Sequence, residues 1–277
     1  MKSFIASAVL GAAALANAAT IPHGHAHTHV KRSPIQFMSL ADVARLDSVE
    51  GFGGENAGPS SVLTAASVKI GANLAAAANP DAPITVGGDG PFKVEFINES
   101  EDDIIVVAWS DVGMSNPWDA AIVTKTQPAV THTLQANTST VVSFDPTKAG
   151  GKLSGAWTAI YPDTILNNGF IFEAWGEYTF TDMSVFSTTD VSRATNMNGH
   201  KMAIHNFANE GDAVPACSST WDKCSFVCPE GQQFCQYGVN IQNCPVGTPG
   251  TTSSSDYQHG GCAGMRNNGG YMRAHFF

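Results

Sequence analysis

The placement of the cysteines is the feature that most limits how this chain can fold. All six lie between Cys217 and Cys262, and the preceding 216 residues contain none. That long first part must therefore fold by burial of apolar surface alone. The stretch 247–261 is dominated by glycine and serine, so the last part has little core and needs covalent cross-links to hold a shape.

The spacing of the cysteines favours disulfides over a metal site. The paired two-residue spacing that is typical of zinc sites is missing, and an exported chain meets an oxidising environment. Six cysteines allow 15 pairings, and the sequence does not choose among them. We predict disulfide bonds for Cys217, Cys224, Cys228, Cys235, Cys244 and Cys262.

The N-terminus predicts export. Residues 1–19 combine the basic Lys2, an apolar run over residues 4–15 and a small-x-small cleavage site at residues 16–18, which is the pattern of a signal peptide. The apolar run is shorter than the roughly 20 residues that span a bilayer. We expect a secreted protein, extracellular or in the cell wall, with no membrane partner.

A second processing signal follows directly. Residues 20–32 end in the dibasic pair Lys31–Arg32, which kexin-type proteases cut, so we predict a pro-segment and a mature N-terminus at Ser33. Four histidines alternate along this segment: His23, His25, His27 and His29. In an extended chain they would project to one side and could hold copper, nickel or zinc. Because cleavage discards them, we favour a disposable pro-segment over a working metal site, and we expect no metal or cofactor in the mature chain.

Charge excludes one class of partner. Removing Lys2, Lys31 and Arg32 with the leader leaves 11 basic against 24 acidic side chains, a formal charge of −13. Phosphate backbones and anionic lipids repel such a chain, so nucleic acid is excluded, whereas neutral glycans and cationic surfaces remain open. Sequons at Asn98 and Asn137 predict N-glycans on exposed loops.

The mature chain divides into three regions. Residues 33–83 are rich in Ala, Gly and Ser and predict a flexible arm. Residues 84–209 hold most of the large apolar side chains, in short runs separated by Gly, Pro, Asn and Asp, which is typical of an all-β sandwich or barrel. Residues 210–277 form the disulfide-rich C-terminal segment.

Several strands can be predicted individually. Residues 92–96 alternate apolar and charged side chains, and we expect them to form a hairpin with residues 104–109. Residues 131–134 and 140–144 flank a turn, and residues 153–161 follow a glycine break. Nothing between them predicts a convincing helix.

The run 170–180 suggests a site. Its even-numbered residues are core-like, and its odd-numbered face places Trp175 between Glu173 and Glu177. An indole flanked by carboxylates is typical of a sugar-binding groove. The alternative is a solvated sheet face, or a packed layer with the glutamates at its margin.

Glu173 and Glu177 cannot together be the two carboxylates of a glycoside hydrolase. Residues four apart on one strand are separated by about 13 Å at ~3.3 Å per residue, whereas hydrolysis needs roughly 5 to 9.5 Å between the carboxyl groups. A second carboxylate must come from elsewhere. The candidates are Asp163, Asp182 and Asp190.

A family resemblance runs over about residues 90–262. The residues that carry it are 134–144, Gly150-Gly151-Lys152-Leu153, Gly176-Glu177-Tyr178-Thr179-Phe180, Asp190-Val191-Ser192, 196–202 and Ile204. Their order resembles that of thaumatin-like proteins, is closer to a group of fungal secreted effectors, and is similar more loosely to the Aspergillus fumigatus allergen 4 family. The resemblance implies a thaumatin-like β-sandwich with a cysteine-rich appendage.

In some thaumatin-like proteins an acidic cleft binds or hydrolyses β-1,3-glucan. By the resemblance, Glu177 matches the cleft glutamate and Asp190 one cleft aspartate. The family arginine has no counterpart in residues 154–158, although Arg193 follows Asp190 closely, and the proline of the Asn-x-Pro-Met motif is absent. These departures weaken the enzymatic implication more than the fold.

We therefore expect a secreted, non-catalytic fungal effector or antigen that acts at a cell wall or host surface, with glycan binding as one mode. Its partner would be β-glucan, another wall polysaccharide or a host surface protein. One alternative is a carboxylate-dependent endo-β-1,3-glucanase with Glu177 as acid and Asp190 as base or nucleophile. Another is a structural wall component in which residues 33–83 are a spacer.

Overall fold

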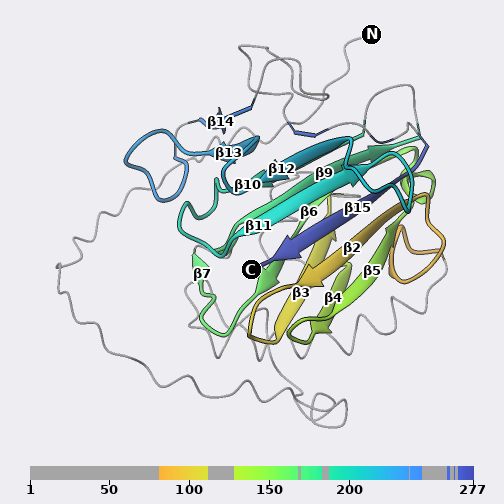
Figure 1. Ribbon diagram of the computed structural model, residues 1–277, viewed down its shortest axis with the longest axis horizontal. Helices are drawn as coiled ribbons and strands as arrows, with labels where there is room; N and C mark the ends of the chain where they lie inside the picture. The colour runs from red at the N-terminus through yellow and green to blue at the C-terminus, as the bar shows by residue number, and fades with distance from the viewer. Residues whose placement is uncertain are drawn as a thin grey trace.

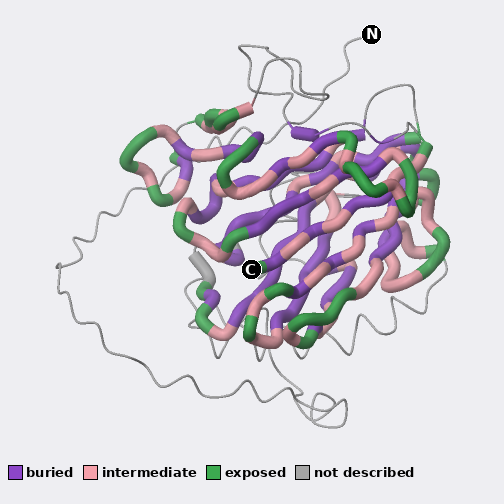
Figure 2. The backbone as a smooth tube through the Cα atoms, viewed as in Figure 1, coloured by how far each residue is buried: buried purple, intermediate pink, exposed green. Residues whose placement is uncertain are grey.

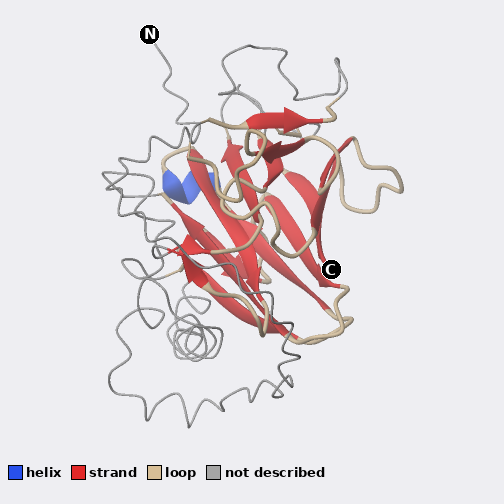
Figure 3. Cartoon of the chain, turned by 90° about the vertical axis from the view of Figure 1, so that its left-hand side faces the viewer, coloured by secondary structure: helices blue, strands red, loops and turns tan. Residues whose placement is uncertain are grey.

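The computed structural model describes eight stretches of the chain: residues 81–111, 128–167, 170–182, 187–236, 238–244, 261–262, 265 and 268–277. The predicted signal peptide, pro-segment and nearly all of the arm lie outside them. The described chain is all-β, with two large sheets packed face to face (Figures 1 and 3). In this part of the chain no helix is long and apolar enough to cross a membrane.

The first sheet has six strands in the order β1-β5-β2-β15-β11-β12. Their bounds are β1 (Ile84–Val86), β5 (Ser139–Phe144), β2 (Phe92–Asn98), β15 (Gly270–Phe276), β11 (Met202–Phe207) and β12 (Cys217–Thr220). Only the β15–β2 pair is parallel. The last strand of the chain therefore lies in the middle of this sheet, between β2 and β11 (Figure 1).

The second sheet has seven strands in the order β14-β13-β10-β9-β6-β3-β4. Their bounds are β14 (Asn240–Gln242), β13 (Ser225–Val227), β10 (Thr188–Ser192), β9 (Trp175–Thr181), β6 (Lys152–Ile160), β3 (Ile104–Ser110) and β4 (Val130–Leu134). Two short strands, β7 (Leu166–Asn167) and β8 (Phe170–Ile171), pair beside it. Among the described residues there is one 3-10 turn, η1 (Pro146–Ala149), which begins where the Asp145 side chain accepts the Thr147 N–H.

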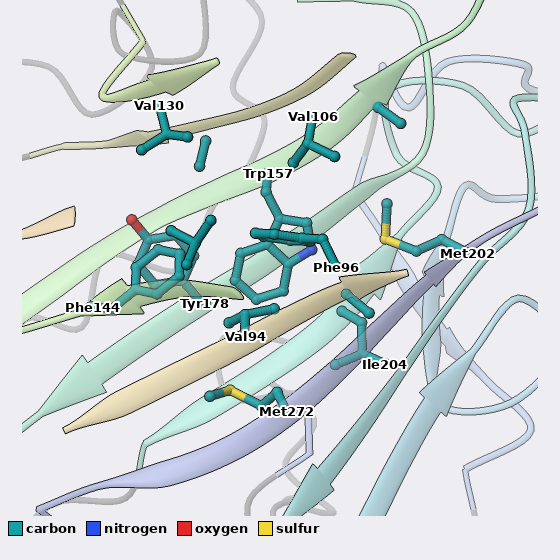
Figure 4. Close-up of a cluster of buried hydrophobic side chains, with 14 of the residues drawn as sticks. Val94, Phe96, Val106, Val130, Phe144, Trp157, Tyr178, Met202, Ile204 and Met272 are labelled. Atoms are coloured by element: carbon teal, nitrogen blue, oxygen red, sulfur yellow. The ribbon is translucent and has the colours of Figure 1, made fainter. Parts of the chain in front are cut away.

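The core fills the space between the sheets. Strand β2 alternates buried and half-buried residues, whereas β3 is buried along almost its whole length (Figure 2). Trp157 is fully buried there, with its ring stacked on Tyr178 and edge-on to Phe96 (Figure 4). Gly176 lies under the Trp157 indole, where an added Cβ would sit 2.1 Å from Nε1. The Trp157 indole therefore fits only over a glycine at position 176. The two sheets confirm the all-β prediction for residues 84–209.

The predicted hairpin between residues 92–96 and 104–109 is wrong in its pairing. Both runs are strands, but β2 pairs with β5 and β15, whereas β3 lies in the other sheet between β6 and β4. The turn between them carries the chain from one sheet to the other. β4 and β5 are separated in the same way. An alternating pattern identifies a strand with one buried face, but it does not say which sheet supplies the cover.

The boundary that the sequence suggests at residue 209 does not separate two bodies. Strand β15 belongs to the last segment, yet Met272, Ala274 and Phe276 on it lie in the main core. The segment is tied to the sandwich by backbone pairing on both edges of β15. The C-terminal region is therefore part of the sandwich and not only an appendage.

All six cysteines form disulfides, as predicted. The pairs are Cys217–Cys262, Cys224–Cys244 and Cys228–Cys235. The first joins the start of β12 to a short segment that bridges Thr189 of β10. The other two hold the small region around β13 and β14. One bridge therefore cross-links the sandwich itself, and the other two cross-link the small region beside it.

The two sequons lie in different environments. Asn98 is fully buried, and its Nδ2 donates to the carbonyl oxygens of Asp102 and Leu134 at 2.8 and 3.1 Å. Asn137 is exposed at a turn with φ 58°. Glycosylation at Asn98 stays a prediction, but it requires the folded geometry to give up both hydrogen bonds.

We expect a glycan at Asn137 and little or none at Asn98 when the chain is secreted from a eukaryotic host. Peptide mass spectrometry after deglycosylation measures the occupancy of each site. Asn137→Gln should remove the mass added by the glycan and lower the melting temperature slightly, because residue 137 has a positive φ that asparagine tolerates better than glutamine. Asn98→Gln should destabilise the fold more, because it disturbs the two buried hydrogen bonds. Full occupancy at Asn98 would contradict the buried geometry.

Candidate functional site

The run 170–180 is two strands and not one. β8 ends at Ile171, and β9 begins at Trp175. The two-faced pattern holds within β9, where Tyr178 and Phe180 enter the core and Glu177 lies on the opposite face. Because the intervening residues leave the strand, the three predicted glycan-binding side chains do not line one surface.

Glu173 is buried in a local network. Its Oε1 accepts from Thr164 Oγ1 at 2.7 Å, and its Oε2 accepts from the backbone N–H of His200 at 2.8 Å. The His200 ring stacks on Tyr161, with ring centroids 3.6 Å apart, and its Nδ1 lies 3.1 Å from Glu173 Oε1. Asp163 Oδ1 is 3.4 Å from the other ring nitrogen. Glu173 and Asp163 therefore fix the position of His200 and are not partners of Glu177.

The charges around His200 shift its protonation. Burial acts to lower the pKa of the imidazole, but the hydrogen bond and charge of Glu173, together with nearby aspartates, outweigh burial and raise the pKa above its ordinary value. The imidazole of His200 therefore favours its protonated form, and it lies between the carboxylates of Glu173 and Asp163, the second of which is in the loop that follows β6. Its role is to tie that loop to the segment before β11.

Trp175 is buried as well. Only 4% of it is exposed, its indole N–H donates to the carbonyl of Ile171 at 3.0 Å, and its ring meets Trp109 edge-on at 5.1 Å. A sugar cannot stack on an indole that is covered and already hydrogen-bonded to its own chain. The packed-layer alternative therefore describes Trp175 better than the sugar groove.

Glu177 and Asp190 do come together. They are directly opposite each other in the antiparallel β9–β10 register, where Cβ atoms lie about 4.5–5.5 Å apart. Both side chains point away from the inter-sheet core, since the neighbouring Tyr178 and Val191 point into it. The backbone thus brings two carboxyl groups, predicted from separate parts of the sequence, to one place.

The environment of this pair favours its protonated forms. Burial raises the pKa of both carboxyl groups, and the negative charge of Glu177 raises that of Asp190 further, whereas a hydrogen bond from Ser192 lowers that of Glu177. Asp190 is 7% exposed, and its Oδ1 has no hydrogen-bond partner. Although part of the Glu177 residue reaches solvent, its carboxyl group is surrounded by protein. Ionising both of these adjacent, buried carboxyl groups is therefore energetically unfavourable.

A segment linked by a disulfide closes over Asp190. Cys262 exchanges two backbone hydrogen bonds with Thr189, at 2.6 and 3.0 Å. At the preceding Gly261, an added Cβ would lie 3.1 Å from Asp190 Oδ2. The Cys217–Cys262 bridge thus holds a backbone directly against the carboxyl pair, which limits access to Asp190 from this side.

Arg193 does not replace the missing cleft arginine. Its guanidinium lies 4.0 Å over the Trp221 ring and donates to the carbonyls of Trp221 and Met197 and to Gln242 Oε1. Among the described residues, no cationic side chain forms a salt bridge with Glu177 or Asp190. The pair is therefore acidic without a compensating charge.

Residues 89–243 match the Allergen Asp f 4-like domain, which is more than half of the chain. The chain belongs to this family. No curated protein matches the sequence. In this Asp f 4-like chain the matched region contains both carboxyls of the pair, while β15 lies beyond it.

Sequence reasoning missed one partly buried acidic residue at the end of a strand of the second sheet, whose charge acts on the core residue Tyr178. Asp111 follows β3, and its backbone N–H donates to the Ser154 carbonyl. Burial raises the pKa of its carboxyl, although Lys152 opposes the shift. Asp182, by contrast, is exposed at the far end of β9 and is too distant along the strand to pair with Glu177. A position just past the end of a strand offers no periodic signal that would have revealed Asp111.

Proposed function

We propose that this Asp f 4-like chain is a secreted fungal effector or antigen that acts at a cell wall or host surface by binding and not by catalysis. The observation that carries the proposal is the state of the carboxyl pair. Asp190 is almost inaccessible, lies against a disulfide-held backbone, and has its pKa well above the ordinary value. A glycosidase needs both carboxyls to reach the sugar, one of them ionised.

The two-sheet sandwich and its three disulfides also support the finer parts of the proposal. A thaumatin-like relationship accords with this architecture and with the position of Glu177 opposite Asp190. Disulfides persist in oxidising compartments, which agrees with an extracellular or wall location.

The outer face of the first sheet offers a place for binding. A surface hollow of about 220 Å³ opens beside Lys93, Asn209, Glu210 and Tyr271. Next to it, Glu95 Oε2 accepts from Tyr271 Oη at 2.7 Å and from Arg273 Nε at 3.2 Å. Polar groups that are held in place around a hollow are suited to sugar hydroxyls, so we propose β-glucan or another wall polysaccharide as a ligand of this hollow.

Two assays test the proposal. The first measures reducing ends released from laminarin by the wild-type protein, by Glu177→Gln and by the matched exposed control Glu99→Gln. We expect no release by any of them. Release by wild type and Glu99→Gln that is lost in Glu177→Gln would overturn the non-catalytic proposal.

The second assay measures retention on insoluble β-1,3-glucan, with chitin as the comparison. We expect retention on the glucan that falls in Lys93→Ala and Asn209→Ala and is unchanged in Lys148→Ala, an exposed lysine at the η1 turn. Retention on neither polysaccharide would remove the glycan from the proposal and leave a host surface protein as the partner.

One observation keeps the glucanase as a second candidate. Glu177 and Asp190 face each other across two paired strands, and the charge of Glu177 raises the pKa of Asp190. Such a pair can share one proton and so supply an acid and a base. The laminarin assay decides between the two candidates.

A further inference from the structure

We propose that His205 and His275 form a surface site for a late divalent transition metal, with Cu²⁺ bound most strongly. The two residues lie on neighbouring strands β11 and β15, where His205 is opposite Arg273 and His275 is opposite Ala203. They are therefore diagonal neighbours on one face. That face is the outer one, because Ile204 and Ala274 beside them point into the core.

The ring geometry suits a shared ion. The two imidazole centroids are 5.3 Å apart. With a metal–nitrogen distance of about 2.0–2.1 Å, two imidazoles on one tetrahedral ion have centroids about 5 Å apart. The interplanar angle of 76° shows that the rings are not stacked against each other. Only side-chain rotation is needed to bring both nitrogens to one ion.

Flanking residues occupy the outer nitrogen of each ring. His205 Nδ1 is 2.7 Å from Ser218 Oγ on β12, and His275 Nδ1 is 2.8 Å from Glu99 Oε1, after β2. In the sheet order these partners lie on opposite sides of the pair. Within the described chain, no hydrogen bond occupies either Nε2. A carboxylate or hydroxyl on Nδ1 fixes the ring and leaves Nε2 to bind a metal, as in many metalloproteins.

The surrounding charges permit a cation. Arg273 lies opposite His205 in the register, and its guanidinium is engaged with Glu95 Oε2 at 3.2 Å. Glu99 adds a negative charge beside His275. Because the part of the chain described holds no cluster of three or more ligating side chains, water would complete the coordination.

Imidazole ligands suit copper, nickel and zinc, and affinity among these rises toward Cu²⁺. The test uses the unprocessed chain, which keeps residues 20–32, with the tract histidines replaced by Gln because they would bind metal themselves: His23, His25, His27 and His29. Calorimetric and electron paramagnetic resonance titration with Cu²⁺ at pH 7.5 should show one ion per chain bound through nitrogen.

Variants identify the ligands. His205→Gln and His275→Gln should each weaken Cu²⁺ binding at least about tenfold, and the double variant should abolish it, whereas His132→Gln on β4 should bind as the parent does. Glu99→Ala should weaken binding about 10- to 100-fold by releasing the His275 ring. Its side chain is 42% exposed, so this variant tests the site even where a histidine variant misfolds. Parent-like binding by the double variant, or no binding by the tract-substituted protein, would overturn the proposal.

Discussion

Deleting residues 270–277 is expected to abolish cooperative folding of the entire sandwich. Strand β15 separates β2 from β11, so its loss splits the first sheet into two parts that no longer share hydrogen bonds. It also removes Met272 and Phe276, which are 0% and 1% exposed. Truncating such residues singly costs about 2–5 kcal/mol each, and whole domains have only about 5–15 kcal/mol.

Near-ultraviolet circular dichroism and a thermal melt measure the outcome. The deleted protein should show no cooperative transition, and Met272→Ala should fold with stability lowered by about 2–5 kcal/mol. Deleting only Phe277, which is 45% exposed, is the matched control and should be nearly silent. A cooperative melt in the longer deletion would mean that the sandwich folds without β15.

The three disulfides are expected to contribute unequally to the stability of the sandwich. Cys217–Cys262 spans 45 residues, and loop entropy predicts a contribution of about 4 kcal/mol. Cys228–Cys235 spans 7 residues, and the same relation gives about 2 kcal/mol. The first bridge also fixes the segment that pairs with Thr189 in the sandwich. Loss of this bridge should therefore lower the stability of the whole sandwich. Reduction of the disulfides should destabilise the sheets as well as loosen the C-terminal region.

The sequence predicted the strands of this protein better than their partners. Alternation in residues 92–96 identified β2, because a strand with one buried face has period two. It could not reveal that β2 pairs in parallel with β15, nearly 180 residues later. Glycine-rich residues before β15 and clustered cysteines pointed to a stapled appendage. The actual arrangement depends on long-range packing that no local pattern encodes.

The candidate site was predictable in part for a similar reason. The family motifs indicated Glu177 and Asp190, and the β9–β10 register places them opposite each other. The alternation that grouped Glu177 with Glu173 and Trp175 failed because the strand is interrupted between residues 171 and 175. A period-two pattern assumes an unbroken strand. Only the fold shows where that assumption ends.

The carboxyl pair should make this protein more stable in acid than at neutral pH. The ordinary pKa values are 3.8 for Asp190 and 4.5 for Glu177, and both are raised in the folded state. Between the ordinary and the raised pKa values the folded chain holds more protons than the unfolded chain, so the free energy of unfolding falls as pH rises. The raised pKa of His200 acts with the same sign, since its contribution is complete below 6.5 and is lost as pH rises through the folded pKa.

The Asp190→Asn variant distinguishes the contribution of the carboxyl pair to the pH dependence of stability from that of His200. The new amide is neutral at every pH and can donate to the Glu177 carboxylate, so the penalty for charging a buried pair disappears. At pH 7.5 the variant should be more stable than wild type by about 1–3 kcal/mol, the cost of a buried unsatisfied polar group, or roughly 2–4 °C in melting temperature per kcal/mol. At pH 4 the two proteins should melt close together, because the wild-type pair is then already protonated. Thermal melts from pH 4 to 8 measure this, and His200→Asn, which should leave the carboxyl contribution in place, is the control. An Asp190→Asn variant that is destabilised equally at both pH values would show instead that the carboxyl is ionised and held by a cation.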